Sequence, residues 1–436
     1  MILAGHLLLP DDDRPGHARL ATGTVRLDGE QIVEVIECPA DQFPQSIAAA
    51  GPQSLSTPGF IDTHLHLPQF DTIGAHGLPL LEWLDGVTFP AERRWEDPDY
   101  ARGMTQRVVD QLLAHGTTGI CAYATVHHAG THAAMEVARD AGLRGVIGQT
   151  LIERHAPDFL SRPAAQLLDE TARLLDAFPP DGSGVRSGGS SGGRVSAAVT
   201  PRFAITCTAE FMAEMGQLAA ERDAFIQSHL AETVPECEFI AELFDGTSYV
   251  DVYGDAGLLT PKSIYGHGIY LDSDDRKSLA QTGAMIAHCP TANSFLRSGT
   301  MDRRSHRARD VRTTLGSDIG GGYERSMVRV GRAMIEAAAS FASVPAKELP
   351  GASEAWWQIT TGNAKALGWS DGGRLAAGAS ADVVVIEPDI RWLPAVDQPE
   401  NEPLVDPLAL LMWAWDDRWV KQTLVRGQPA YDTTSN

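Results

Sequence analysis

Residues 57–69 read Thr57-Pro-Gly-Phe-Ile-Asp-Thr-His-Leu-His-Leu-Pro-Gln69 and predict a β-strand that ends in two histidines. Side chains alternate across a strand, so His64 and His66 are expected on one face, where both can reach the same atom. Neutral imidazole is a common metal ligand, especially for zinc. Two histidines at this spacing are more often surface or packing residues, so the meaning of the pair depends on the rest of the chain.

The sequence that follows this strand alternates between strand-like and helix-like patterns. Eight strands with intervening helices favour an α/β fold, a (β/α)8 TIM-like barrel, and a doubly wound open sheet is the alternative. The expected helices include residues 100–115, 131–141, 164–177 and 210–222. The expected strands are residues 59–66, 119–126, 143–152, 195–205, 224–230, 263–267, 284–288 and 312–316.

The two ends of the chain share a different pattern, short apolar runs separated by Gly, Pro and Asp turns. We expect residues 1–57 and 370–436 to form one small β-sandwich domain built from both termini. Residues 58–369 would then form the catalytic barrel. The Gly/Ser-rich stretch 182–193 is interpreted as a tolerated surface insertion.

Composition excludes several classes of protein. Of 436 residues, 43% are hydrophobic and 21% charged, as in globular proteins. The formal net charge of -22 argues against nucleic acid as a partner, because phosphates require clustered Lys and Arg. No run of about 18 apolar residues predicts a membrane span. The five cysteines are scattered and form no C-x-x-C, which favours a reducing, cytoplasmic location.

Polar residues follow several other predicted strands at the point where each ends. They occur in His229-Leu-Ala-Glu232, Gly266-His267 and Gly316-Ser-Asp318. Active sites of such barrels form at this face, and three histidines with one carboxylate can hold a zinc ion that keeps one position open. Each residue alone is more often a turn or packing residue. Five on one face are much harder to explain by packing.

At these residues the chain resembles the amidohydrolase superfamily, in its mononuclear, deaminase-type branch. No lysine lies in residues 198–207, where binuclear branches place a carboxylated lysine, so one metal ion is favoured over two. Longer blocks resemble the guanine deaminase family. They are Leu67-Pro-Gln69-Phe, Leu78-Pro-Leu-Leu-Glu-Trp-Leu84, Thr88-Phe-Pro-Ala-Glu-Arg93, Tyr123-Ala-Thr-Val-His127, Thr200-Pro-Arg202-Phe203, His288-Cys-Pro and Gly316-Ser-Asp-Ile-Gly-Gly-Gly-Tyr323.

The resemblance implies a role for each matching residue. The implied zinc ligands are His64, His66, His229 and Asp318. The implied purine contacts are Gln69, Arg202 and Phe203, together with Glu232. Glu232 would shuttle protons, and His267 and Asp318 would take part in catalysis beside the metal. His127 matches the family but receives no role.

The implied activity is zinc-dependent deamination of guanine to xanthine and ammonia, a step of purine catabolism or salvage. Iron is the alternative metal, since the His/Asp set suits either ion. Ala231 and Thr233 depart from the family pattern, which leaves 8-oxoguanine, a pterin or a triazine as alternative substrates. A non-catalytic scaffold is disfavoured, because every implied metal ligand is present. The resemblance also implies a homodimer.

Overall fold

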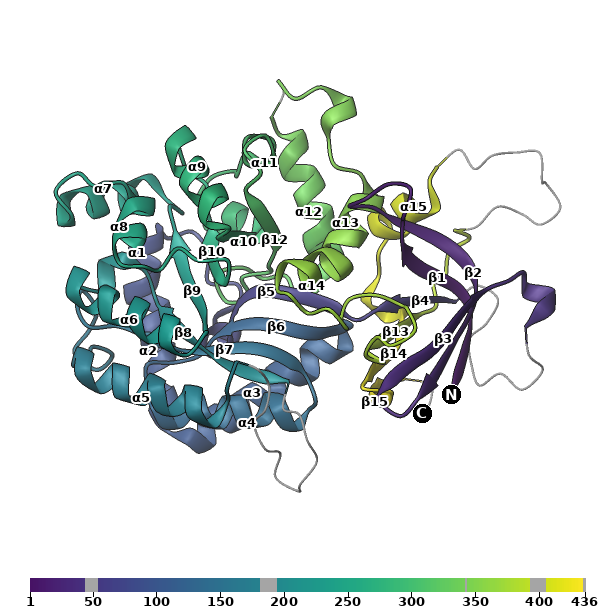
Figure 1. Cartoon of the computed structure of the whole chain (residues 1–436), viewed down its shortest axis with the longest axis horizontal. Coiled ribbons are helices and arrows are strands. Elements are labelled where there is room, and N and C mark those ends of the chain that lie inside the picture. The colour runs from purple at the N-terminus through teal and green to yellow at the C-terminus, as the bar shows by residue number, and fades with distance from the viewer. Residues whose placement is uncertain (44–53, 181–193, 342, 393–404, 434–436) are drawn as a thin grey trace. The chain divides into compact units, whose positions relative to one another are not determined.

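The structure is a computed structural model that describes residues 1–43, 54–180, 194–341, 343–392 and 405–433. The predicted insertion at 182–193 lies outside these residues. The chain divides into two compact units (Figure 1). One comprises residues 1–62, 110–119 and 325–436, and the other comprises residues 63–109 and 120–324.

An eight-stranded sheet carries the strand ends predicted to be functional. Its strands follow the chain order from β5 to β12, and neighbours from β7 to β12 pair in parallel. The strands are β5 (Phe60–His66), β6 (Thr117–Tyr123), β7 (Arg144–Leu151), β8 (Val195–Pro201), β9 (Phe225–Leu230), β10 (Ser263–His267), β11 (Met285–His288) and β12 (Arg312–Leu315).

The first and last strands of this sheet approach each other. Thr63 Oγ1 donates to the Leu315 carbonyl at 2.8 Å, and the Asp318 N–H donates to the His64 carbonyl at 2.8 Å. The sheet is therefore a nearly closed barrel, as predicted, and not an open doubly wound sheet. The predicted fourth strand was too long, because β8 ends at Pro201 and a short 3₁₀ turn follows.

Helices separate the barrel strands, and local capping explains where several begin. The side chain of Thr208 caps α6, and capping boxes open α7 at Thr233 and α9 at Asp272. Helix α9 ends at Gly283, whose φ of +73° suits a residue without Cβ. The helices are α3 (Pro98–Ala114), α4 (His128–Asp140), α5 (Ala164–Ala177), α6 (Ala209–Glu221), α7 (Val234–Leu243), α8 (Tyr249–Asp255), α9 (Ser273–Thr282), α10 (Pro290–Phe295) and α11 (Arg303–Arg307).

The segment between β5 and α3 consists of short helical turns. They are η2 (Leu67–Thr72), α1 (Leu80–Trp83), the π-turn η3 (Leu84–Thr88), α2 (Phe89–Arg93) and η4 (Arg94–Glu96). A π-turn inside a helical run often occurs near a functional site. The segment buries the side chains of Trp83 and Glu92.

The two ends of the chain form a seven-stranded mixed sheet in the order β15-β14-β13-β4-β1-β2-β3. Strands from both ends share one apolar core, to which Leu7, Val25, Ile32, Val383 and Leu424 belong. The strands are β1 (Ile2–Pro10), β2 (Ala18–Asp28), β3 (Gln31–Glu37), β4 (Leu55–Pro58), β13 (Val383–Ile386), β14 (Val420–Val425) and β15 (Gln428–Asp432).

The unit that holds this sheet also contains helical segments after the barrel. They are α12 (Met327–Ala339), α13 (Ala352–Trp357), the π-turn η7 (Gln358–Gly362), α14 (Asn363–Ala366) and α15 (Pro407–Trp413). Over the described residues, no helix is both long enough and apolar enough to cross a membrane.

Candidate active site

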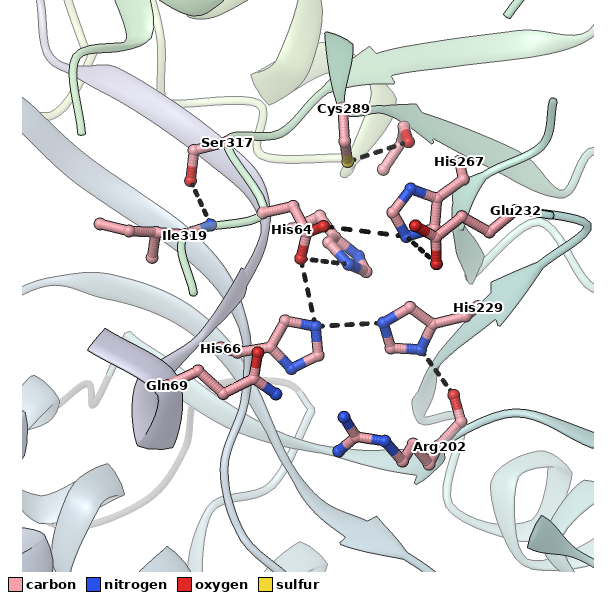
Figure 2. A network of polar contacts seen from close by, with 12 residues as sticks. His64, His66, Gln69, Arg202, His229, Glu232, His267, Cys289, Ser317 and Ile319 are labelled. Atoms are coloured by element: carbon pink, nitrogen blue, oxygen red, sulfur yellow. Dashed lines mark hydrogen bonds and ion pairs between the residues drawn. The ribbon is translucent and has the colours of Figure 1, made fainter. Parts of the chain in front are cut away.

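Strand ends bring the predicted metal ligands together (Figure 2). His64 and His66 lie on β5, His229 on β9, and Asp318 three residues after β12. The ligand nitrogens of His64, His66 and His229 lie within 4.8 Å of one another. So do the ligand atoms of His64, His267 and Asp318. Residues up to 254 positions apart in the sequence therefore face one point.

The contacts inside this cluster are short. Asp318 Oδ1 lies 3.4 Å from His64 Nε2 and 3.3 Å from His66 Nε2. His66 Nε2 and His229 Nε2 are 3.1 Å apart. The side chains of His64, His66 and Asp318 are at most 4% exposed. Four donor atoms therefore converge in a space from which bulk water is nearly excluded.

Glycines permit this close approach. A Cβ on Gly266 would lie 2.5 Å from His64 Cε1, and a Cβ on Gly316 would lie 2.6 Å from His64 Cβ. A Cβ on Gly321 would lie 2.7 Å from Asp318 Oδ2. Real Cβ atoms do not come this close to other atoms. The glycine positions are therefore part of what shapes the cluster.

The backbone is also unusual at the site. His267, Asp318 and Ala231 adopt φ values of +73°, +51° and +49°. Left-handed backbone costs a residue with a side chain about 1 kcal/mol or more and tends to occur at functional sites. Of these three residues, His267 and Asp318 line the pocket.

The electrostatics of the cluster suit a metal ion. Burial lowers the pKa of His64, and it lowers that of His66 to about 4. Burial, with the neighbouring imidazoles second, holds the pKa of His229 well below its usual range. Burial alone would raise the pKa of Asp318, but His64 and His66 hold it well below normal. Neutral imidazoles beside an ionised carboxylate form a donor set that a divalent cation accepts.

Further contacts orient the ligands. His229 Nδ1 lies 2.6 Å from the Arg202 carbonyl, so the proton on Nδ1 leaves the lone pair of Nε2 toward the cluster. The Tyr123 ring packs on His64, His66 and His229, with ring centroids 5.0, 4.7 and 4.8 Å away. Such support fixes ring orientation, as it does around known metal sites.

Glu232 and His267 form a buried acid–base pair beside the cluster. His267 Nε2 lies 3.4 Å from Glu232 Oε2 and 3.9 Å from Asp318 Oδ2. Burial raises the pKa of Glu232. Burial lowers the pKa of His267, but the charges of Glu232 and Asp318 outweigh it and raise this pKa overall. Both shifts favour the protonated form of each group, so the pair can hold a proton that one member passes to the other.

Two side chains, one from α10 and one from the loop after it, fix this pair. Ser298 Oγ donates to Glu232 Oε1 at 2.6 Å, and His267 Nδ1 lies 2.8 Å from Asn293 Oδ1. Glu236 accepts the Glu232 N–H at 2.9 Å within the capping box that Thr233 opens. The departure from the family pattern at Thr233 thus has a structural role as a helix cap.

The predicted purine contacts lie near the same cluster. Arg202 and Phe203 line the pocket, and Gln69 is 1% exposed and lies beside Arg202 and His66 (Figure 2). The pocket encloses an empty volume of about 380 Å³, part of which is open to solvent. Its walls are His66, Leu80, Trp83, Leu84, Arg202, Phe203, His229, Glu232, Glu236, His267, Leu296, Asp318 and Gly321.

Several residues had no predicted role, and the structure shows where they lie. His127 lies 3.4 Å from Arg162 through its Nδ1, and no contact with the cluster is recorded for it among the described residues. Tyr123 and Glu92 belong to blocks that carry the family resemblance, but no role was predicted for either residue. Asn293 lies in residues 291–296, which differ somewhat from the usual family run, but neither it nor Ser298 had a predicted role. Only the folded chain brings α10 and its following loop beside His267 and Glu232.

Comparisons with known proteins agree with this geometry. The sequence profile described as "Amidohydrolase family" matches residues 55–430. The chain is 34% identical to guanine deaminase of Escherichia coli K12 over 381 residues, which are 87% of this chain and 83% of that protein. It is 34% identical to guanine deaminase of Dictyostelium discoideum over 374 residues, 85% of this chain and 81% of that protein. A solved structure of the E. coli guanine deaminase superposes with a TM-score of 0.87 at 31% identity, covering 99% of both chains.

Proposed function

This chain belongs to the amidohydrolase family, and from that premise we propose that it hydrolyses guanine to xanthine and ammonia. The observation that carries the proposal is a single pocket. It combines a His/Asp cluster, the buried acid Glu232 and the guanidinium of Arg202. Relatives that match more than four fifths of the chain are guanine deaminases, which supports the same substrate.

We assign His64, His66, His229 and Asp318 as the ligands of one metal ion. The donor set fits a divalent cation, and Asp318 Oδ1 has no hydrogen-bond donor among the residues that the structure describes. We propose zinc as the native ion, with iron as the alternative that the same ligands accept. When bound, such an ion acts as a Lewis acid that makes water a competent nucleophile near neutral pH.

The chain's own residues handle the protons. Glu232, held by Ser298, gives a proton to a ring nitrogen beside the carbon that bears the amino group. That carbon becomes electrophilic, and water oxygen adds to it. His267, between Glu232 and Asp318, donates a hydrogen bond where negative charge develops on that oxygen. Glu232 takes up one proton of the adding water, which restores its acid form, and relays the second water proton to the amino group.

The balance of the reaction follows from these transfers. The carbon–oxygen bond forms, the carbon–nitrogen bond breaks, and ammonia leaves with one proton of the water. The other water proton replaces the one that Glu232 gave to the ring nitrogen, so the side chain ends as it began. Arg202, Gln69 and Phe203 take no part in these steps. We propose that they hold the ring, with Phe203 against its face and the two polar side chains at its edge.

The test is turnover of guanine by the purified protein, with xanthine and ammonia quantified together. Metal content per chain is measured on the same sample. We expect guanine to give xanthine and ammonia in equal amounts. Ammonia release from 8-oxoguanine, a pterin or a triazine should be slower. If one of those rings reacts faster than guanine, that ring is the substrate instead. Metal-loaded protein that is inactive on every ring would refute the proposed reaction.

Two further proposals rest on the family alone. The protein is proposed to be a homodimer, which light scattering after size-exclusion chromatography would test. It is proposed to act in the cytoplasm, in purine catabolism or salvage. Fractionation of the producing cells would test the location, and a monomeric mass would refute the dimer.

A further inference from the structure

Behind Arg202, which lines the pocket, lies a buried carboxylate that the proposed reaction does not use. Glu92, on α2, is fully buried. Its Oε1 accepts from Arg202 Nη1 at 2.6 Å and from Gln69 Nε2 at 3.1 Å. One carboxylate oxygen therefore contacts both polar side chains that we assign to the ring edge.

Helix α2 places two of its side chains against Arg202. Phe89 and Glu92 are three residues apart and so share one face of the short helix. The Arg202 guanidinium lies 5.4 Å from the centre of the Phe89 ring while it pairs with Glu92. The ring and the carboxylate together restrict the rotamer of Arg202. The ion pair also makes this wall neutral overall, which suits an uncharged ring.

Glu92 also decides which end of the Gln69 amide is available. Because the amide N–H₂ donates to the carboxylate, the carbonyl Oε1 remains as an acceptor. Gln69 Oε1 and Glu92 Oε2 are both buried, and neither has a hydrogen-bond donor among the described residues. A buried acceptor without a donor is costly, so this wall is matched to a ligand that brings N–H groups.

We propose that Glu92 is a positioning residue that sets the substrate specificity of this pocket. It holds Arg202 as a donor and Gln69 as an acceptor, side by side. That pattern is complementary to a lactam edge, in which a ring carbonyl lies next to a ring N–H. The inference rests on the proposed function, because it selects among rings with the same reacting amino group.

The test compares guanine with 2-aminopurine, which carries the same amino group but has neither the carbonyl nor the adjacent N–H. In E92Q the charge is lost: the amide oxygen can still accept in place of Oε1, but the ion pair with Arg202 becomes a neutral hydrogen bond that holds the guanidinium more weakly. The ratio of kcat/KM for guanine to that for 2-aminopurine should fall about tenfold to a hundredfold, mainly through a higher KM for guanine. E92D, which keeps the charge on a shorter stem, should restore part of the ratio.

Glu170 supplies a matched control outside the pocket. It is a buried glutamate that accepts from Gln149 Nε2 at 2.7 Å and from Gln166 Nε2 at 2.9 Å. E170Q should leave the ratio unchanged. A general loss of folding or metal would lower both kcat/KM values equally, so an unchanged ratio in E92Q would refute the inference.

Crystal structures of the wild type and E92Q separate this inference from the proposed reaction. The guanidinium of Arg202 or the amide of Gln69 should turn in the variant. If both keep their positions, Glu92 does not position them, whatever the substrate. If the wild type fails to act on guanine while these side chains do turn, the proposed reaction fails but the positioning role stands.

Discussion

Replacing Glu232 by glutamine tests the proton transfer with little change of shape. Ser298 Oγ donates to Glu232 Oε1 at 2.6 Å, and a glutamine carbonyl can accept the same hydrogen bond. Glu232 belongs to neither group of converging metal-ligand atoms. The substitution therefore removes the acidic proton and the charge beside His267 while it leaves the His/Asp cluster in place.

The expected size of the effect follows from the role. A positioned general acid–base contributes about 10²–10⁴-fold to a rate, which corresponds to about 3–5 kcal/mol of barrier. We expect E232Q to lower kcat for guanine by about a thousandfold, because one side chain serves both transfers. KM should change less than kcat, since Arg202, Gln69 and Phe203 still hold the ring.

The folding stability of E232Q is a second measurement, and it should not fall as the activity does. Burial raises the pKa of Glu232, so the folded state holds its proton more tightly than the unfolded chain does. Such a group stabilises the fold most at acidic pH and loses that contribution as pH rises. E232Q should therefore be at least as stable as the wild type at pH 8, with unchanged metal content.

The assay is steady-state xanthine formation at pH 8, with metal analysis and thermal unfolding of each variant. E238Q, which changes an exposed glutamate on α7, is the control and should behave as the wild type. A kcat of E232Q within about tenfold of the wild type, at full metal content, would refute the proton-transfer role.

Three other predictions address the metal, the glycines and pH. G266A places a Cβ 2.5 Å from His64 Cε1 and should lower metal affinity about tenfold or more, measured by competition with a chelator. G103A is the control: it lies in open space on α3 and should stabilise the fold by about 0.5–1 kcal/mol. A chelator should abolish activity, and restoration by zinc but not by ferrous iron, assayed without oxygen, would identify the ion. Burial raises the pKa of Glu236 from 4.5 to about 7, so this acid stabilises the fold below pH 4.5 and loses that contribution as pH rises through about 7. E236Q should therefore remove about 3 kcal/mol of pH dependence from urea unfolding of the metal-free protein across this interval, and equal slopes in both proteins would contradict the assignment.

The barrel could be predicted because its strands carry short-range signals. Residues 263–267 and 284–288 are apolar runs that end in histidine, and the structure has strands there within one residue. Strand ends were less certain. The apolar run 195–205 continues past Pro201, where the backbone leaves the sheet, and residues 204–206 form a 3₁₀ turn instead.

The cluster at the strand ends could also be predicted, because a parallel barrel brings all those ends to one face. The side chains that orient it could not. Asn293 reaches His267 from α10, and Glu92 reaches Arg202 across 110 positions of sequence. No periodicity encodes these contacts, because the packing of the short helices α2 and α10 against the strand ends decides them.

Opposite pKa shifts divide the carboxylates of the pocket by role. Asp318 and Glu232 are both buried, and burial favours the neutral form of each. Asp318 faces His64 and His66, which hold its pKa far down and keep it an anion. Burial raises the pKa of Glu232 by more than the charge of His267 lowers it, so this pKa stays above its usual value. Two acids with separated pKa values can serve different steps at one pH, one as a metal ligand and the other as a proton carrier. In D318E the acid at position 318 should therefore still be the metal ligand, and in E232D the acid at position 232 should still carry the proton. The environment of each position, and not the length of its side chain, assigns the role.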